Sequence, residues 1–172
     1  HSALDPKAYR KAVALLAESE FIDIFGVENS LTPAMDLFTK LGYLGLTCRL
    51  NTDAYLQQIG AGHLPHGAVA VAFSHSGSSA DTVKALRLAK SHGAKTIAIT
   101  NAIGAPLASW ADVTLLTGRD SHTIYGNAIF SRVADTALVD MLYMGVILSG
   151  YGRFSTALDE SGRMIRDRVF EN

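Results

Sequence analysis

The chain has 172 residues, of which 48% are hydrophobic and 18% charged, and its mean hydropathy is +0.18. This length and composition suit one well-buried domain over residues 1–172 and exclude a disordered chain. The net charge is −1, and Lys and Arg are scattered rather than clustered. The chain by itself is therefore not expected to bind DNA.

Cysteine content and hydropathy indicate the compartment. Cys48 is the only cysteine, which excludes a disulfide framework and a thiolate metal site and fits a reducing cytoplasm. No apolar run reaches the roughly 18 residues of a membrane span, and the first residues lack the pattern of a signal peptide. We expect a cytoplasmic protein with no membrane contact and no cofactor. The chain starts at His1 rather than at Met, which suggests that residues are missing upstream.

Strand and helix patterns alternate along most of the chain. Asp5 and Pro6 favour a helix start, so the first helix is expected from there to about Ser19. Apolar runs predict strands at 21–25, 46–50, 68–73, 96–100 and 113–116. Helical spacing predicts helices from about Thr32, at 53–59 and at 79–91, with a helical turn at 106–110.

The middle of the chain forms a complete βαβ unit in this interpretation. The runs at 68–73 and 96–100 are almost wholly apolar, as is typical of buried strands in a parallel sheet. Gly93 can end the intervening helix with a left-handed residue. The pattern as a whole predicts an α/β fold with a three-layer, doubly wound and mainly parallel sheet.

The last third of the chain is different. From Ile124 to Leu148 it is apolar on nearly every side, and Gly150 is expected to end this helix. Such a helix needs cover on more than one side, so it is either central to the fold or shared with a second subunit, and we favour a subunit interface. A charged amphipathic helix is expected from Ser155 to Phe170.

Four serines lie between the central strand and the helix that follows it: Ser74, Ser76, Ser78 and Ser79. A helix start presents unpaired backbone N–H groups and a positive dipole end, and hydroxyl groups around a flexible Gly add further donors. One or two serines would indicate only a helix cap. Four of them predict an anion site.

A second loop, Gly26–Ser30, follows the strand at 21–25 and contains Asn29. Ligands of open α/β sheets bind at the carboxyl ends of the strands. If the two strands are neighbours, Ser30 and the serines of the other loop converge on one anion. Each charge-assisted hydrogen bond would then contribute about 1.5 to 3 kcal/mol.

Three segments together resemble a known family. They are Ser74-His-Ser-Gly-Ser-Ser-Ala-Asp-Thr82, the Gly26-x-x-x-Ser30 loop with Ala34 beyond it, and Gly93-Ala-Lys-Thr-Ile-Ala-Ile-Thr100. They resemble the sugar isomerase (SIS) domain, a flavodoxin-like fold that binds phosphosugars, over nearly the whole chain. More narrowly, Asp53–Gln57 and Ser131–Tyr143 are similar to the effector domain of RpiR-type transcriptional regulators.

The resemblance implies which residues contact the ligand. Ser30, Ser74, Ser76 and Ser79 would hold the phosphate, the backbone around His75 and Gly77 would complete its site, and the sugar would extend toward Asp53 and the long helix. The full set implied is Asn29, Ser30, Asp53, Ser74, His75, Ser76, Gly77 and Ser79. Glu28 stands where the family usually has a second Gly, and Tyr55 where regulators often have His. Both differences concern the identity of the ligand more than the fold.

Several side chains have two interpretations. His75 is either a donor or proton shuttle at the ligand, or a side chain that points away while its amide binds. Glu28 either bonds a sugar hydroxyl or, the interpretation we favour, caps the helix near Thr32 or is solvated. Arg132 contacts a ligand or subunit, or forms a structural ion pair. His63, His66 and His122 lack the spacing of a helical metal pair, so no metal site is expected.

The same residues bear on catalysis. Sugar-phosphate isomerisation needs a base, usually Glu or His, and no glutamate lies between Glu28 and Glu160. Only His75, His122, Glu28 or an Asp remains, and the region near the long helix holds Asn127, Ser131 and Arg132 instead.

The absence of a nearby glutamate makes a sensor our leading hypothesis. The chain is expected to be the phosphosugar-binding effector domain of a regulator of carbohydrate metabolism, and not an enzyme. It would self-associate as a dimer or tetramer and contact DNA only through a missing N-terminal domain. The alternatives are a single-domain sugar-phosphate aldose/ketose isomerase and a subunit-contact domain with an empty site.

Overall fold

The computed structural model describes residues 4–118 and 132–168. Five strands form one sheet in the order β2-β1-β3-β4-β5, and all four pairings are parallel. The strands are β1 (Ile22–Phe25), β2 (Cys48–Leu50), β3 (Val69–Phe73), β4 (Lys95–Thr100) and β5 (Val113–Leu116). The predicted α/β fold with a parallel sheet is confirmed.

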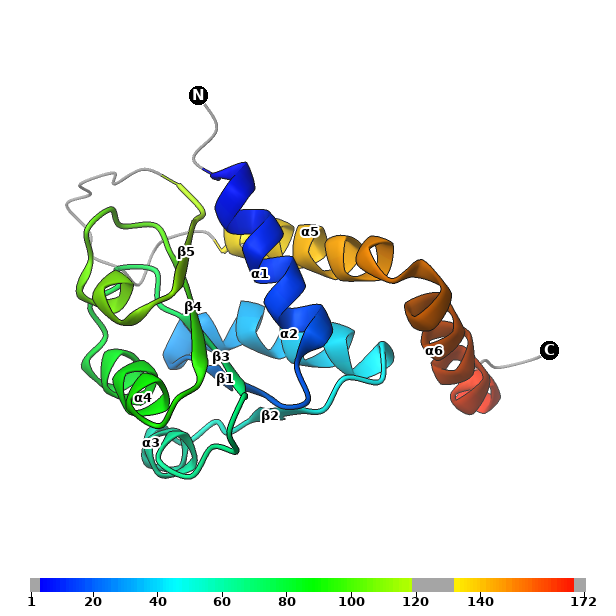
Figure 1. The fold of residues 1–172 in the computed structure, drawn as a ribbon, viewed down its shortest axis with the longest axis horizontal. Coiled ribbons are helices and arrows are strands. Elements are labelled where there is room, and N and C mark those ends of the chain that lie inside the picture. Colours follow the sequence, from blue (N-terminus) through cyan, green and yellow to red (C-terminus); the bar gives the residue numbers. More distant parts are fainter. Residues whose placement is uncertain (1–3, 119–131, 169–172) are drawn as a thin grey trace.

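Helices cover both faces of the sheet (Figure 1). They are α1 (Pro6–Glu18), α2 (Leu31–Tyr43), α3 (Ala54–Ala61), α4 (Ala80–Ser91), α5 (Val133–Ser149) and α6 (Tyr151–Met164). Short 3-10 turns lie at Glu28–Ser30, Pro106–Trp110 and Arg166–Arg168. One layer consists of α1, α2 and α5 and the other of α3 and α4, while α6 projects from the end of α5 (Figure 1).

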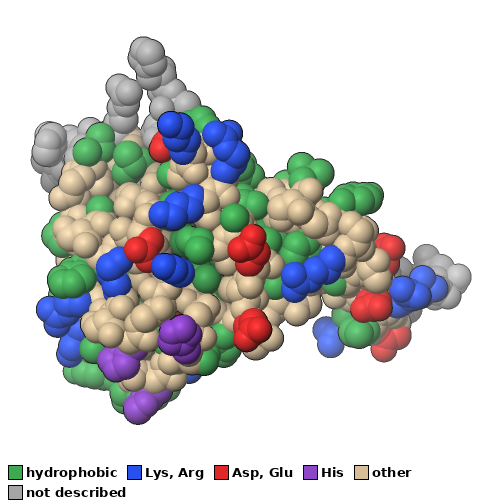
Figure 2. Space-filling view, in the orientation of Figure 1, with side chains coloured by type: hydrophobic (Ala, Val, Ile, Leu, Met, Phe, Trp, Pro, Cys, Tyr) green, Lys and Arg blue, Asp and Glu red, His purple; other side chains and the backbone are tan. Residues whose placement is uncertain are grey.

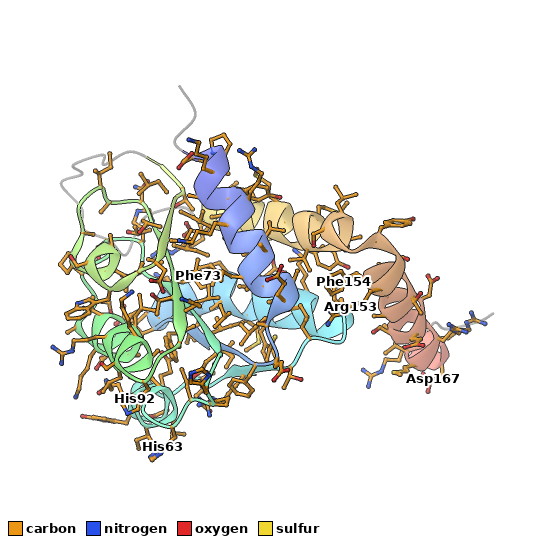
Figure 3. All side chains as sticks on the ribbon, viewed as in Figure 1. His63, Phe73, His92, Arg153, Phe154 and Asp167 are labelled. Carbon is orange, nitrogen blue, oxygen red and sulfur yellow. The ribbon has the colours of Figure 1, made fainter. Side chains whose placement is uncertain are left out.

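The sequence explains the two layers at the central strand β3, whose side chains alternate between large and small. Val69, Val71 and Phe73 of β3 belong to the core beneath α1, α2 and α5, where Figure 3 labels Phe73. Ala70 and Ala72 belong to the core on the α3 and α4 side. Both sides are buried, as the apolar run of this strand predicts, and the small alanines let α4 lie close to the sheet.

The start of α1 and the end of α4 follow the local signals predicted for them. The Asp5 carboxylate accepts a hydrogen bond of 3.0 Å from the Lys7 backbone N–H, with Pro6 in the first turn. The chain leaves α4 through Gly93, whose φ of 86° is the expected left-handed residue. Such local signals place the helix boundaries because they satisfy backbone groups that the helix itself leaves unpaired.

The boundaries that differ most from the prediction are the two ends of α6. Helix α6 begins at Tyr151, not Ser155, because the buried Phe154 closes its first turn with a hydrogen bond from its N–H to the Gly150 carbonyl. It ends at Met164 rather than continuing to residue 170. Helix α5 is described from Val133, and the expected portion at 124–131 lies outside the described residues.

The surface fits the composition. On the face in Figure 2, Lys and Arg side chains are interspersed with Asp and Glu. Within residues 4–118 and 132–168, no single helix is long and apolar enough to cross a membrane, and only α5 and α6 taken together, with a 116° bend, reach that length and composition.

Candidate functional site

The two predicted loops meet at the carboxyl edge of the sheet. Strands β1 and β3 are hydrogen-bonded neighbours, with Phe25 opposite Ala72, so the loops that follow them lie side by side. A pocket of about 470 Å³ opens between these loops and the first turn of α4. Its lining residues are Val27, Glu28, Asn29, Ser30, Ser74, His75, Ser76, Ser78, Ser79, Asp81 and Arg132.

Six of the eight residues implied as ligand contacts line this pocket: Asn29, Ser30, Ser74, His75, Ser76 and Ser79. Asp53 and Gly77 are not among its lining residues. The Asp53 carboxylate instead caps α3 by accepting a hydrogen bond of 2.9 Å from the Leu56 N–H. Its structural role is therefore local, and its contact with a sugar stays a prediction.

Gly77 shapes the loop of residues 74–79, called the serine loop below, although it is not among the residues that line the pocket. Its φ is 63°, a backbone conformation that residues with a side chain rarely adopt. A Cβ at this position would also lie 2.3 Å from the Ala105 Cβ. Its N–H donates to the Ser74 carbonyl and its carbonyl accepts from the Leu107 N–H. Only glycine allows the loop to fold this tightly against the residues that follow β4.

The serine loop leads directly into α4 and has local hydrogen bonds of its own. The Ser76 hydroxyl accepts from the Ser78 N–H at 3.2 Å. The hydrogen bonds of the helix begin with the Val83 N–H and the Ser79 carbonyl, so the N–H groups at 80–82 have no partner within the helix. These N–H groups and the helix dipole make the edge of the pocket suitable for a phosphate dianion.

His75 is held mainly through its backbone. Its carbonyl accepts from the Asn101 N–H at 3.0 Å and from the Thr100 hydroxyl at 3.1 Å, which ties the loop to the end of β4. The imidazole Nε2 lies 3.5 Å from the Asn101 Nδ2, and the residue lines the pocket. Both interpretations of His75, side-chain donor and backbone ligand, therefore stay predictions.

Three charged residues surround the serines. Glu28 and Asp81 bring carboxylates to the lining, and Arg132, which precedes α5, brings a guanidinium. Arg132 is thus at the pocket, which supports the ligand-contact alternative. Ser30, rather than Glu28, is in the N-cap position of α2. Glu28 has a φ of 51°, which gives a physical reason for the Gly that the family usually has there.

The sequence analysis missed two glutamines of α3 that support the pocket. Gln57 hydrogen-bonds Gly26, where the first loop starts, and the Gln58 amide donates to the Asp81 carboxylate at 2.9 Å. Both glutamines are buried. The resemblance of Asp53–Gln57 to the effector domain of regulators includes Gln57, but neither it nor two consecutive amides in a helix indicates that these side chains support the pocket.

Histidines lie elsewhere as well. Figure 3 labels His63 and His92 at the ends of α3 and α4. Among the described residues there is no group of three or more His, Cys, Asp or Glu side chains that could hold a metal ion. His122, Asn127 and Ser131 lie outside the described residues.

Comparison with known proteins decides the family. The family model described as the SIS domain matches residues 15–145. The chain belongs to the SIS domain family. The resemblance to this family is thereby confirmed, and the parallel α/β fold agrees with it.

Relatives within this SIS domain family include regulators. An HTH-type transcriptional regulator of Caldanaerobacter subterraneus is 30% identical over 171 residues, which cover 99% of this chain and 61% of that protein. The HTH-type transcriptional regulator RpiR of Escherichia coli is 26% identical over 143 residues, covering 83% of this chain and 48% of that protein. This chain thus spans about half to three-fifths of the length of these relatives.

A solved structure agrees with the sequence relatives. The Vibrio vulnificus NanR protein, complexed with ManNAc-6P, matches with a TM-score of 0.90 and 25% identity. The match covers 98% of this SIS domain chain and 63% of NanR. The narrower resemblance to RpiR-type regulators is confirmed by these relatives.

Proposed function

We propose that this chain is the phosphosugar-binding effector domain of an RpiR-type transcriptional regulator of carbohydrate metabolism. The observation that carries the proposal is the convergence of Ser30 with Ser74, Ser76 and Ser79 at the amino end of α4. A site of hydroxyl and backbone N–H donors suits a phosphate monoester. The regulators among the relatives, and NanR with its ManNAc-6P, support the same function.

Each part of the pocket has a role in this proposal. The serines and the first turn of α4 receive the phosphate, and Arg132 offsets its charge. Asn29, on the other loop, faces the sugar hydroxyls. Because Arg132 precedes α5, a bound phosphate would favour one position of that helix, and ligand binding would shift the equilibrium between two arrangements of the protein. DNA would be contacted by another domain of the regulator.

Self-association through α5 is part of the same proposal. Met141, Met144 and Leu148 are 46%, 50% and 68% exposed on one side of this helix. Hydrophobic side chains protrude there over α5 in Figure 2. Asp140, on the same side, is paired with Lys40. A neutral apolar stripe is complementary to itself, as an interface between two identical subunits must be, so we propose a second copy as the partner, in a dimer or tetramer.

The experiment is ligand binding to the purified chain, followed by thermal unfolding and calorimetry. The ligands would be N-acetylmannosamine 6-phosphate, glucose 6-phosphate, ribose 5-phosphate and inorganic phosphate. At least one sugar phosphate should raise the melting temperature well above the effect of inorganic phosphate. If none of the sugar phosphates does so, the proposed function is wrong.

A matched pair of variants tests whether binding occurs in this pocket. Ser76→Ala removes one donor to the phosphate and should weaken binding about tenfold, the effect of one charge-assisted hydrogen bond. Ser91→Ala removes a hydroxyl at the other end of α4, where it donates to the Arg87 carbonyl, and should leave affinity unchanged. Equal effects of the two substitutions would place the binding site elsewhere.

The second candidate is a sugar-phosphate isomerase. It is favoured by one observation, the presence of Glu28, His75 and Asp81 in the pocket lining, since each of these groups can act as a base. Turnover of aldose to ketose phosphates by the purified chain distinguishes the two. A sensor binds without turnover, whereas conversion that is lost in His75→Gln or Glu28→Gln would make the chain an enzyme.

A further inference from the structure

We propose that Gln57 is a positioning residue: its buried amide holds the Gly26–Ser30 loop in the conformation that receives the phosphate, against backbone strain at Glu28. This inference rests on the proposed function and adds to it a residue outside the pocket. It assigns the affinity of the site to a side chain on α3 that does not line it.

The side-chain amide of Gln57 makes three hydrogen bonds to the backbone. Its Oε1 accepts from the Gly26 N–H at 3.2 Å, and its Nε2 donates to the Gly26 carbonyl at 2.7 Å and to the Asn51 carbonyl at 2.8 Å. The residue is only 2% exposed. Both backbone groups of Gly26 are therefore fixed by one side chain, and in a buried setting these bonds are costly to lose.

Gly26 is connected to the pocket by a short and strained segment. A Cβ on Gly26 would lie 3.1 Å from the Ser30 carbonyl oxygen, so the loop folds back closely onto the residue that Gln57 holds. Between them, Glu28 has a φ of 51°, in the left-handed region that a residue with a side chain rarely adopts. Such a conformation persists only where its surroundings impose it.

Helix α3 itself is fixed firmly enough to impose that conformation. Asp53 caps its first turn, and at Gly60 the guanidinium of Arg49 packs so close that a Cβ would lie 2.6 Å from its Nη2. Arg49 is in turn held by the buried Asp23 in a bidentate ion pair. The next residue, Gln58, binds Asp81 on the opposite side of the pocket. One helix thus holds both halves of the phosphate site at a fixed separation.

Without the Gln57 amide, the loop is expected to relax to an ordinary φ at Glu28, which would move Asn29 and Ser30 away from the serine loop. If Gln57 only satisfied buried backbone groups, its replacement would lower the stability of the chain, and the effect would not depend on the strain at Glu28. The coupling between positions 57 and 28 separates the two roles, because Gly at position 28 has no strain to relax.

The test is a double-mutant cycle on the chain with Gln57→Met and Glu28→Gly, using the dissociation constant for N-acetylmannosamine 6-phosphate and the melting temperature. Gln57→Met should weaken binding about tenfold in the wild-type background and only about two- to threefold in the Glu28→Gly background. If Gln57→Met does not fold, Gln57→Glu replaces it in the cycle. This variant keeps the size and the acceptor of the side chain but not its donor, and should also weaken binding.

Thr96→Val is the matched structural control. Thr96 is fully buried, and its hydroxyl donates to the Trp110 carbonyl at the opposite end of the strands from the pocket. It should lower the melting temperature and leave the dissociation constant unchanged. An equal loss of affinity from Gln57→Met in both backgrounds, or a similar loss from Thr96→Val, would overturn the inference.

Amide hydrogen exchange gives a readout that does not require the sugar phosphate to bind. The Ser30 N–H donates to the Val27 carbonyl within the loop and does not touch Gln57. Its exchange should accelerate in Gln57→Met and slow again when Glu28→Gly is added. If the wild-type chain binds no sugar phosphate, the proposed function fails, and the Ser30 exchange alone decides the role of Gln57: unchanged exchange in Gln57→Met contradicts it.

Discussion

At the residue scale, burial determines the chemistry of Cys48. This side chain packs against the core beneath α1, α2 and α5, and burial raises the pKa of its thiol to about 12. The thiolate fraction near pH 8 therefore falls about a thousandfold relative to an ordinary thiol, and the thiolate is the reactive form. Alkylation by iodoacetamide should be far slower in the native chain than in urea. Because Cys48 is the only cysteine, mass spectrometry reads the rate directly, and equal rates in both states would contradict the burial argument.

Gly77 provides a second prediction at this scale. Gly77→Ala combines a positive φ with a contact of 2.3 Å between the new Cβ and that of Ala105. It should destabilise the chain by about 1–3 kcal/mol in urea unfolding and also weaken the proposed binding of a sugar phosphate, since the serine loop must shift. Gly67→Ala is the control, because Gly67 has a φ of 79° but open space around it. If the two substitutions lower the free energy of unfolding equally, the positive φ alone, and not the close contact with Ala105, explains the need for glycine at position 77.

At the element scale, Asp112 connects three secondary-structure elements. Asp112 lies just before β5 begins. Its carboxylate accepts hydrogen bonds from the Thr96 N–H at the start of β4 and from the Lys90 ammonium on α4. Burial alone would raise the pKa of Asp112, but these hydrogen bonds and the Lys90 charge outweigh it and lower the pKa below the usual 3.8. The charged form is thus favoured in the folded chain.

The consequence is a dependence of stability on pH with a definite sign. Because the pKa of Asp112 is lowered on folding, its contribution is complete above about pH 4 and is lost as the pH falls through the folded value. Asp112→Asn should cost about 1 kcal/mol at pH 6 and progressively less toward pH 3, measured by urea unfolding. Burial raises the pKa of Asp23, so this residue has the opposite effect on the pH dependence of stability. It is present in both the wild-type chain and Asp112→Asn, so its effect cancels in the difference between them. A difference that stays constant with pH would contradict the role of Asp112.

The elements also show what the sequence could predict. The strands and the start of α1 follow from local rules, namely apolar runs and the Asp5 cap, which act within a few residues. The serine loop was predictable for the same reason. Gln57 and Gln58 were not, because their partners Gly26 and Asp81 are 31 and 23 residues away and are reached only after the sheet has formed. The start of α6 was missed because the buried Phe154, and not a local cap, fixes it.

At the scale of the whole molecule, the order of the strands creates the site. The chain passes from β1 to the edge strand β2 and then back to β3, so the loops after β1 and β3 become neighbours although 44 residues separate Ser30 from Ser74. The sequence predicts the parallel sheet, but only the observed order brings these serines to one pocket. Arg132, from much later in the chain, joins them just before α5 begins, so the pocket adjoins the helix that carries the exposed stripe.

The proposed self-association through the exposed stripe of α5, Met141, Met144 and Leu148, gives the prediction at the largest scale. Met144→Lys places a charge among the exposed apolar side chains of α5, and in a two-fold interface each contact contains two copies of the change. The dissociation constant of the dimer, measured by sedimentation equilibrium, should rise about a hundredfold while the monomer stays folded. Ile59→Lys makes the same change on α3, where Ile59 is 58% exposed, and should leave association intact. If both variants weaken association equally, or neither does, the subunits meet through another face, and the link from Arg132 through α5 to the second copy is lost with it.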